Sequence, residues 1–181
     1  MKTSEKTREA YLRAMAAHVL DHGLIGASLR PLAKAAGTSD RMLIYHFGSK
    51  DGLMAALLEL LAADFTKLLD GALPEAPMPS RRELLGNVLA YVRSPVVAAY
   101  IRVWREVTTL AGLGNAAHVE TGKIVIQGFV DWLERRMPVD DPNPYGEAQI
   151  MLTLIEGVHV MDAVGRSDVA DAAIETLYPL V

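Results

Sequence analysis

Apolar side chains recur at intervals of three and four residues through most of this 181-residue chain, and no stretch sustains the alternation of apolar and polar residues that is typical of a strand. Gly and Pro residues divide the chain into segments of helical length. The segments predicted to be helical are 5–22, 29–36, 40–47, 50–70, 81–92, 95–110, 116–137, 144–165 and a last short helix, capped by Ser167, that ends before Pro179. The sequence therefore predicts an all-α fold.

Capping signals support several of these helix ends. Small polar side chains suit helix N-termini because they accept hydrogen bonds from unpaired backbone N–H groups, and Gly suits C-termini. The expected N-caps are Ser28, either Thr38 or Ser39, and Ser80, which has the spacing of a capping box with Glu83; Gly23 is the expected end of the first helix.

Composition limits the class of protein. About half of the residues (51%) are apolar, enough to bury one core or a small head with a larger body. The chain has no Cys and no signal-peptide pattern, so we expect a cytoplasmic protein. Its most apolar stretches end far short of the roughly 18 residues that cross a bilayer, so we expect no membrane span.

Basic charge is concentrated near the N-terminus. Residues 1–55 carry eight Lys or Arg against five Asp or Glu, whereas residues 56–181 carry ten against seventeen. This asymmetry is consistent with a polyanionic partner for the first third of the chain. Solvated charged faces produce similar differences, so charge by itself does not decide the function.

Two short predicted helices with a tight turn between them occupy residues 29–47 and have the features of a helix-turn-helix. Ala33 supplies a small side chain where the helices cross closely, and Gly37, four residues later, suits the turn because it has no Cβ. The side chains expected to hold the second of these helices in place are Leu29, Leu32, Met42 or Leu43, and Phe47.

The helix 40–47 then presents polar side chains that can read DNA. Hydroxyl, guanidinium, phenol and imidazole groups can reach base edges and phosphates in a major groove about 12 Å wide. Lys50 begins the next helix, where a cationic side chain and free backbone N–H groups can bind one phosphate. The side chains expected to point away from the core are Ser39, Asp40, Arg41, Tyr45 and His46.

Taken together, these residues resemble the N-terminal domain of the TetR family of transcriptional regulators. The likeness is close over residues 28–53 and covers the layout of residues 5–70. The matching features are helix 29–36, the turn Gly37-Thr38-Ser39, the pair His46-Phe47, and Ser49-Lys50 followed by Leu53.

This chain departs from the family pattern at two points of the third helix. The family usually has an aromatic residue at the position of Ile44, whereas here Tyr45 follows one place later. Arg41 replaces a frequent small residue. These differences leave open which phosphate is contacted and which base Arg41 reads.

The resemblance implies a division of labour along the chain. It implies a helix-turn-helix DNA-binding domain at 1–48 and a helical regulatory domain at 49–181 for ligand binding and dimerisation, with helix 50–70 connecting the two. The implied function is a ligand-responsive repressor that binds a palindromic operator as a homodimer and leaves it when a small molecule binds. The residues expected to contact DNA are Ser28, Thr38, Ser39, Asp40, Arg41, Met42, Tyr45, His46 and Lys50.

The segments 116–137 and 145–165 are expected to form the dimer interface. The second is apolar on nearly every side, so it must be buried on nearly every side. Gly157 in its middle permits close approach of a partner helix. Paired with their copies, these two helices would make a four-helix interface, as the resemblance also implies. The alternative is that both helices are core of a single chain.

Candidates for a small-molecule site lie on the middle helices of the body. Such sites are mostly apolar with a few orienting polar groups. The expected ligand-binding residues are Tyr91, Tyr100, Trp104, Met151, Ile155 and His159. Each of them also fits an ordinary core position.

Other chemistry finds little support in the sequence. His18 and His22 are four residues apart on one helix, but no third ligand is near them in sequence, so we expect no metal. We find neither a nucleotide loop nor a nucleophile elbow, and we expect no cofactor and no enzymatic activity. Two alternatives remain: a dimeric DNA-binding regulator without an effector, and a helical enzyme or protein-binding module.

Overall fold

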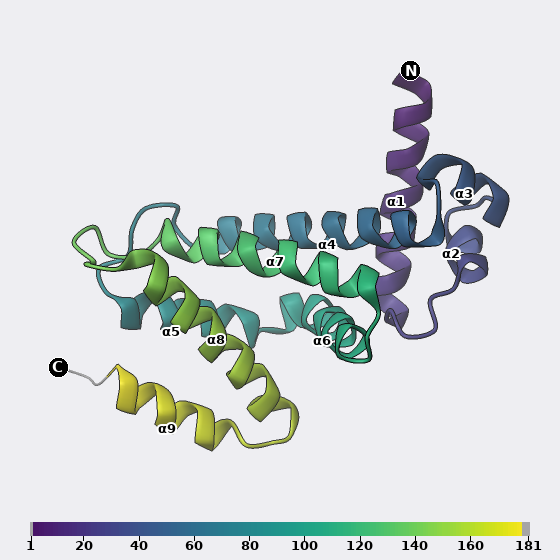
Figure 1. Cartoon of the computed structure of the whole chain (residues 1–181). Coiled ribbons are helices and arrows are strands. Elements are labelled where there is room, and N and C mark those ends of the chain that lie inside the picture. The colour runs from purple at the N-terminus through teal and green to yellow at the C-terminus, as the bar shows by residue number, and fades with distance from the viewer. Residues whose placement is uncertain (1, 179–181) are drawn as a thin grey trace. The chain divides into compact units, whose positions relative to one another are not determined.

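A computed structural model describes residues 2–178 of the chain, and the side chains of residues 5–178; Pro179 lies outside this range. Within it the chain contains helices and no strand, which confirms the all-α prediction. Figure 1 shows the helices, which are α1 (Lys2–His22), α2 (Leu29–Ala35), α3 (Asp40–Phe47), α4 (Lys50–Ala72), α5 (Arg81–Val92), the short 3₁₀ helix η1 (Pro95–Val97), α6 (Ala98–Gly112), α7 (Ala116–Glu134), α8 (Pro144–Ala163) and α9 (Ser167–Leu177). No single helix in the described part of the chain is long and apolar enough to cross a bilayer.

Two of the predicted N-cap residues form side-chain caps. The Ser39 hydroxyl accepts a hydrogen bond from the backbone N–H of Met42 at 3.3 Å, and the Ser80 hydroxyl accepts one from Glu83 at 3.1 Å. Ser28 occupies the N-cap of α2, but its side chain makes no cap hydrogen bond. Ser39, rather than Thr38, is therefore the cap of α3.

Several helix boundaries differ from the sequence prediction by a few residues, and three of these differences have a local cause. The segment 95–110 is divided at Val97, where backbone angles of −108° and 4° separate η1 from α6. α7 ends at Glu134 rather than residue 137, because the N–H groups of Arg136 and Met137 bond three residues back and tighten the last turn. Ser167 is the first residue of α9 and not its cap, which is Arg166.

The chain divides into two compact units by its contacts. Unit 1 comprises Met1–Leu69 with Arg93–Val125, and unit 2 comprises Asp70–Val92 with Ile126–Val181. This division follows contacts rather than function, so the predicted DNA-binding domain 1–48 and regulatory domain 49–181 remain predictions.

Unit 1 has a core built from five helices. α1 crosses the first turns of α4, and α2 and α3 lie beside α1 (Figure 1). Two valines of α6 join the same core. α6 therefore helps to support the helices α1–α3, called the head below, although it follows them by some fifty residues in the chain. The core side chains are Leu12, Met15, Ala16, Val19, Leu24, Leu32, Ala33, Leu43, Leu53, Met54, Leu57, Leu58, Leu61, Val103 and Val107.

Unit 2 contains a buried arginine whose hydrogen bonds are satisfied by its surroundings. The Arg136 guanidinium donates to Asp70 Oδ1 at 2.7 Å, to the Pro74 carbonyl at 3.0 Å and to the Trp132 carbonyl at 3.3 Å. It also lies 3.9 Å from the centroid of the Trp132 ring, whose Nε1 donates to the same Asp70 oxygen at 2.8 Å. Because a buried charge is tolerated only when it is paired and hydrogen-bonded, this arrangement fixes the chain after α4 against the end of α7.

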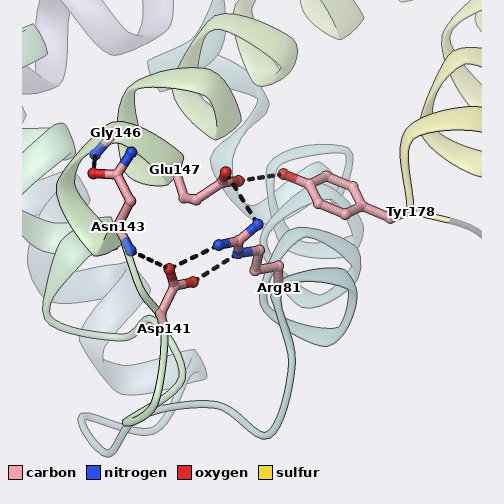
Figure 2. Close-up of polar contacts among 6 residues, drawn as sticks. All are labelled: Arg81, Asp141, Asn143, Gly146, Glu147 and Tyr178. Carbon is pink, nitrogen blue, oxygen red and sulfur yellow. Dashed lines mark hydrogen bonds and ion pairs between the residues drawn. The ribbon is translucent and has the colours of Figure 1, made fainter.

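A second polar network joins four segments of unit 2 (Figure 2). Arg81, the first residue of α5, donates to both carboxylate oxygens of Asp141 at 2.6 and 2.8 Å and pairs with Glu147 of α8 at 3.0 Å. The Tyr178 phenol, just after α9, donates to Glu147 at 3.2 Å. Arg82 donates to the backbone carbonyl of Tyr178. The network therefore connects the start of α5, the loop before α8, α8 itself and the end of α9.

This environment shifts the pKa values of Asp141 and Tyr178. The hydrogen bonds from Arg81 lower the pKa of Asp141 below its usual value of 3.8, because they stabilise the carboxylate. Burial, followed by the nearby charge of Glu147, raises the pKa of Tyr178 to about 12, so its phenol remains a hydrogen-bond donor at neutral pH.

Asp141→Asn should reduce the free energy of unfolding by roughly 1–3 kcal/mol at pH 7, because it removes a charged acceptor from two short hydrogen bonds. A pKa that is lowered in the folded state stabilises the fold above the unfolded value and ceases to do so as the pH falls through the folded value. The difference in unfolding free energy between wild type and variant should therefore have its full size above pH 3.8 and become smaller below it. Urea unfolding between pH 7 and pH 2 measures this.

Asp168→Asn is the matched control, since Asp168 pairs with Arg166 in an exposed position at 2.9 Å. Exposed pairs contribute little, so this variant should unfold with nearly the wild-type free energy. Equal effects of the two substitutions would contradict the role assigned to Asp141.

Candidate nucleic-acid interface

α3 is held in unit 1 by one fully buried side chain and a tight turn before it. Leu43 has no exposed surface. The turn from α2 closes with hydrogen bonds from Thr38 N–H to the Ala33 carbonyl at 2.9 Å and from Gly37 N–H to the Lys34 carbonyl at 3.1 Å. Gly37 has φ = +64°, the left-handed conformation that a residue without Cβ adopts most readily. The sequence prediction of a glycine-dependent helix-turn-helix is thus confirmed.

One edge of α3 is open to solvent. Tyr45 is 76% exposed, and Ser39, Asp40 and Arg41 are exposed beside it. Met42 is 39% exposed and Leu43 is fully buried, so Leu43 is the core residue of the predicted pair. The exposed edge therefore carries a guanidinium, a phenol, a hydroxyl and a carboxylate within two turns.

His46 differs from the other predicted residues because it is half-buried. Its ring packs edge-on against Tyr11 of α1, with 5.5 Å between ring centroids, and against Tyr45 at 5.2 Å. The expectation that His46 points away from the core is therefore corrected: the ring lies between α1 and the exposed edge, in contact with both.

The start of α4 continues this surface. Lys50 is exposed, and the Ser49 hydroxyl caps the helix by accepting from Gly52 N–H at 3.0 Å. A Cβ at Gly52 would lie 2.5 Å from the Phe47 carbonyl oxygen, so only glycine permits so close an approach of α4 to the end of α3. The role of Gly52 was not predicted from the sequence, although the pattern Gly-Ser-Lys-Asp-Gly marked the junction.

The remaining predicted contacts lie near the turn. Ser28 is exposed before α2, and Thr38 is half-buried in the turn before α3. All nine predicted DNA contacts thus belong to unit 1 and lie on α3 or next to it in sequence, apart from Ser28 at the start of α2.

Two charged side chains of α6 form hydrogen bonds with the backbone at the turn between α1 and α2. The Glu106 carboxylate accepts hydrogen bonds from the backbone N–H groups of Leu24 and of Ile25, the latter at 2.8 Å. One turn earlier, the Arg102 guanidinium donates to the carbonyl of Leu20 near the end of α1. These groups would otherwise be unpaired at a helix terminus. Nothing in the sequence identified either residue, because their partners are backbone atoms some eighty positions away.

The six predicted ligand-binding residues are divided between the two units. Tyr100 and Trp104 lie half-buried against the core of unit 1, and the Tyr100 ring is 5.8 Å from that of Phe65. Unit 2 contains Tyr91, which is half-buried, and the buried residues Met151, Ile155 and His159. As a common site, the set remains a prediction.

Unit 1 also contains a buried histidine that the sequence did not indicate as a functional residue. His118 in the first turn of α7 is 7% exposed, and neither ring nitrogen has a hydrogen-bond partner among the described residues. Burial lowers its pKa, against the opposing effect of Asp51, so the ring is neutral at pH 7. A neutral imidazole in this position offers one donor and one acceptor.

His18 and His22 stack with 4.3 Å between ring centroids. No third histidine or carboxylate joins them in a metal-binding group within the part of the chain that the structure describes. The stacking and a contact of 3.0 Å between His22 Nδ1 and the His18 carbonyl account for the pair as a helix-end feature.

An exposed polar helix edge, a glycine turn and a capped helix with a leading lysine together form a helix-turn-helix. Residues 13–57 match the family model described as bacterial regulatory proteins, tetR family. The resemblance to the TetR family is thereby confirmed over this segment.

Two curated relatives are similar to this chain over about half of its length. The HTH-type transcriptional repressor NicS of Pseudomonas putida is 33% identical over 98 residues, covering 51% of this chain and 45% of the relative. The HTH-type transcriptional regulatory protein RaaS of Mycobacterium tuberculosis is 28% identical over 102 residues, covering 56% and 47%. The chain thus spans less than half the length of these relatives.

Solved structures extend the likeness to the whole fold. A TetR transcription regulator from Haloarcula marismortui superposes with a TM-score of 0.69 over 95% of this chain and 94% of its own, at 18% sequence identity. At this identity the likeness concerns the fold, and it confirms the predicted combination of a helix-turn-helix head with further helices.

Gly52→Ala should destabilise the protein by about 1–3 kcal/mol, because the new Cβ would overlap the Phe47 carbonyl oxygen and push α4 away from α3. Gly71→Ala, near the far end of the same helix, is the control: a Cβ there meets nothing within 4 Å, so this change should be neutral or slightly stabilising. Urea unfolding of both variants measures the difference, and a Gly52→Ala protein as stable as Gly71→Ala would contradict the close approach.

Proposed function

We propose that this protein is a transcriptional repressor that binds a roughly palindromic operator as a homodimer and is released by a small molecule. The exposed edge of α3, held by the core of unit 1 within the segment that matches the TetR family, is the observation that carries this proposal. The name of one relative, a transcriptional repressor, supports repression as the mode of action.

The chemistry of the exposed edge fits duplex DNA. The Arg41 guanidinium can donate two hydrogen bonds to one guanine, a contact that distinguishes bases, whereas Tyr45 and Ser39 offer hydroxyls to phosphates or bases. Lys50 at the N-terminus of α4 adds a cation and free N–H groups for a phosphate. Arg41 is thus assigned to base recognition and Lys50 to affinity.

An exposed apolar stripe along α8 and its C-cap residue Val164 supports dimerisation. Ile150, Val160 and Val164 are 45%, 58% and 67% exposed. With the exposed residues Thr153 and Gly157 they follow one another at intervals of three and four, the spacing of a helix-packing seam. A Cβ at Gly157 would meet nothing within 4 Å of its own chain, so the glycine leaves room for something outside the chain. We infer that a copy of α8 occupies it.

The predicted partner helix α7 contributes less exposed apolar surface than the sequence indicated. Ile124 is 61% exposed and Gly128 is exposed, whereas Trp132 is 1% exposed and hydrogen-bonded to Asp70. We propose that the dimer interface comprises the stripe on α8 and the exposed part of α7 around Ile124, with Trp132 in the core of unit 2.

Release by a small molecule requires that the ligand favour one separation of the two heads. In a symmetric dimer the two copies of α3 would enter successive major grooves about 34 Å apart. A coupling free energy of roughly 1–3 kcal/mol would change operator affinity by about 5- to 150-fold. The hydrogen bonds of Glu106 and Arg102 with the backbone at the α1–α2 turn support this proposal, because they would transmit a shift of α6 to the head.

The proposed ligand contacts are the six residues predicted from the sequence, with His118 as a further candidate because it is buried and has no partner among the described residues. The match to a family of regulatory proteins supports the view that the chain is not an enzyme. A DNA-bound role also agrees with the expected cytoplasmic location.

Lys50→Ala and Arg41→Ala should weaken DNA binding in different ways. Removing a phosphate contact should make the plot of log affinity against log salt shallower by about 0.9 per subunit on every duplex. Removing a base contact should cost roughly 1–3 kcal/mol on the preferred duplex and little on others. The measurement is fluorescence anisotropy, over a range of salt, on a duplex selected by the wild-type protein from a random pool and on an unrelated duplex.

Wild-type protein that selects no duplex at low salt would contradict the proposed function. Wild-type binding that neither substitution alters would instead show that the face is assigned wrongly. Selection of an asymmetric sequence would argue against a palindromic operator.

Gly157→Glu should convert the dimer into a monomer, because it places a carboxylate in the seam on α8 while leaving its own chain unstrained. Sedimentation velocity measures the mass. Gly86→Glu is the matched control, since Gly86 is an exposed helical glycine of α5 whose Cβ also meets nothing within 4 Å. A Gly157→Glu protein with the mass of the control would refute this interface.

A further inference from the structure

Arg8 of α1 lies against the end of the proposed recognition helix. Its guanidinium carbon is 4.7 Å from the centroid of the Phe47 ring, and Phe47 is the last residue of α3. Three residues later on the same face of α1, Tyr11 contacts His46 edge-on. α1 therefore contacts the C-terminal end of α3 through two side chains, Tyr11 and Arg8, and Arg8 is the one nearer the N-terminus of α1.

The charge of Arg8 is not compensated within the protein. No carboxylate pairs with Arg8 among residues 5–178, and its side chain is exposed. Arg13, on the same helix, differs in this respect because its guanidinium lies 2.5 Å from Asp64 of α4. α1 thus carries one arginine whose charge is paired and one whose charge is available.

Contact with an aromatic face orients an arginine without using its hydrogen-bond donors. A guanidinium over a ring is attracted by about 0.5–1 kcal/mol at an exposed site, and its N–H groups remain free for a planar acceptor such as phosphate. Phe47 thus restricts the position of Arg8 while leaving its donors unsatisfied.

A second free cation lies close by in the sequence of the head. Lys50, exposed and without an ion pair among the described residues, follows Phe47 by three positions across the α3–α4 junction. If the edge of α3 enters a major groove, the end of that helix faces the phosphates that border the groove. Two uncompensated cations at this end are suited to those phosphates and not to bases.

We propose that Arg8 is a phosphate contact of the DNA-binding head, oriented by Phe47 and acting at the same end of α3 as Lys50. This inference rests on the proposed DNA-binding function and adds to it a residue outside the segment 13–57 that matches the family. Its contribution is to affinity and salt dependence, and it leaves base preference unchanged.

The test uses the full chain and the two duplexes described above, the selected one and the unrelated one. Arg8→Met keeps an apolar stem against Phe47 and removes the charge, Arg8→Lys keeps the charge and loses the planar group, and Arg13→Met is the control on the same helix. For a dimer, Arg8→Met should make the log–log salt dependence shallower by about 1.8, or 0.9 per subunit, equally on both duplexes. The drop in affinity between 50 and 200 mM salt should then be about tenfold smaller than for wild type. Arg8→Lys and Arg13→Met should keep the wild-type slope.

An Arg8→Met protein with the wild-type slope would overturn the proposal. So would weakened binding by both Arg8→Met and Arg8→Lys with unchanged slopes, since that result means that Arg8 only braces α3. Circular dichroism checks folding, and Arg8→Gln serves as a second uncharged variant if Arg8→Met fails to fold. Wild-type protein without salt-dependent binding would overturn the proposed function itself, which distinguishes that failure from the failure of Arg8 alone.

Discussion

The burial of Leu43 is the contact on which the exposed edge of α3 depends. A helix of eight residues is too short to persist by itself in water, so α3 exists because the core of unit 1 holds it. Leu43 inserts fully into that core, the tight turn at Gly37 sets the entry of α3, and the close approach at Gly52 sets its exit. With both ends and one face fixed, the opposite edge is presented at little further cost in conformational entropy.

The head is supported by helices that follow it in the chain. The side chains of α4 and α6 complete its core, and Glu106 and Arg102 satisfy backbone groups at the end of α1 that water would otherwise solvate. Because these charged contacts bind backbone atoms, they restrict where the α1–α2 turn can lie whatever its side chains are. This gives the proposed effector response a physical route inside unit 1, from the position of α6 to the position of the head.

The local parts of the structure were predictable, because their causes lie within a few residues. Gly37, Ser39 and Ser80 act on their nearest neighbours, and spacing predicted the roles of Gly37 and Ser80 and limited the cap of α3 to Thr38 or Ser39. The half-burial of His46 was not predictable, since it depends on Tyr11 of another helix. Which side chains of segment 116–137 face a partner was not predictable for the same reason: an apolar residue at helical spacing can face a partner or the core, and the bond of Trp132 to Asp70 places this residue in the core.

The amino-acid sequence by itself determined the all-α class, most helix boundaries and the resemblance to the TetR family, because periodicity, caps and turn residues act over short distances along the chain. Only the tertiary structure decided which arginine of α1 is paired and which is free. It also decided that α6 forms hydrogen bonds with the backbone at the α1–α2 turn, and that Gly52 must lack a side chain. These features join residues from different helices or junctions, and the pairing of one helix face with another is set by packing in three dimensions rather than by any local pattern.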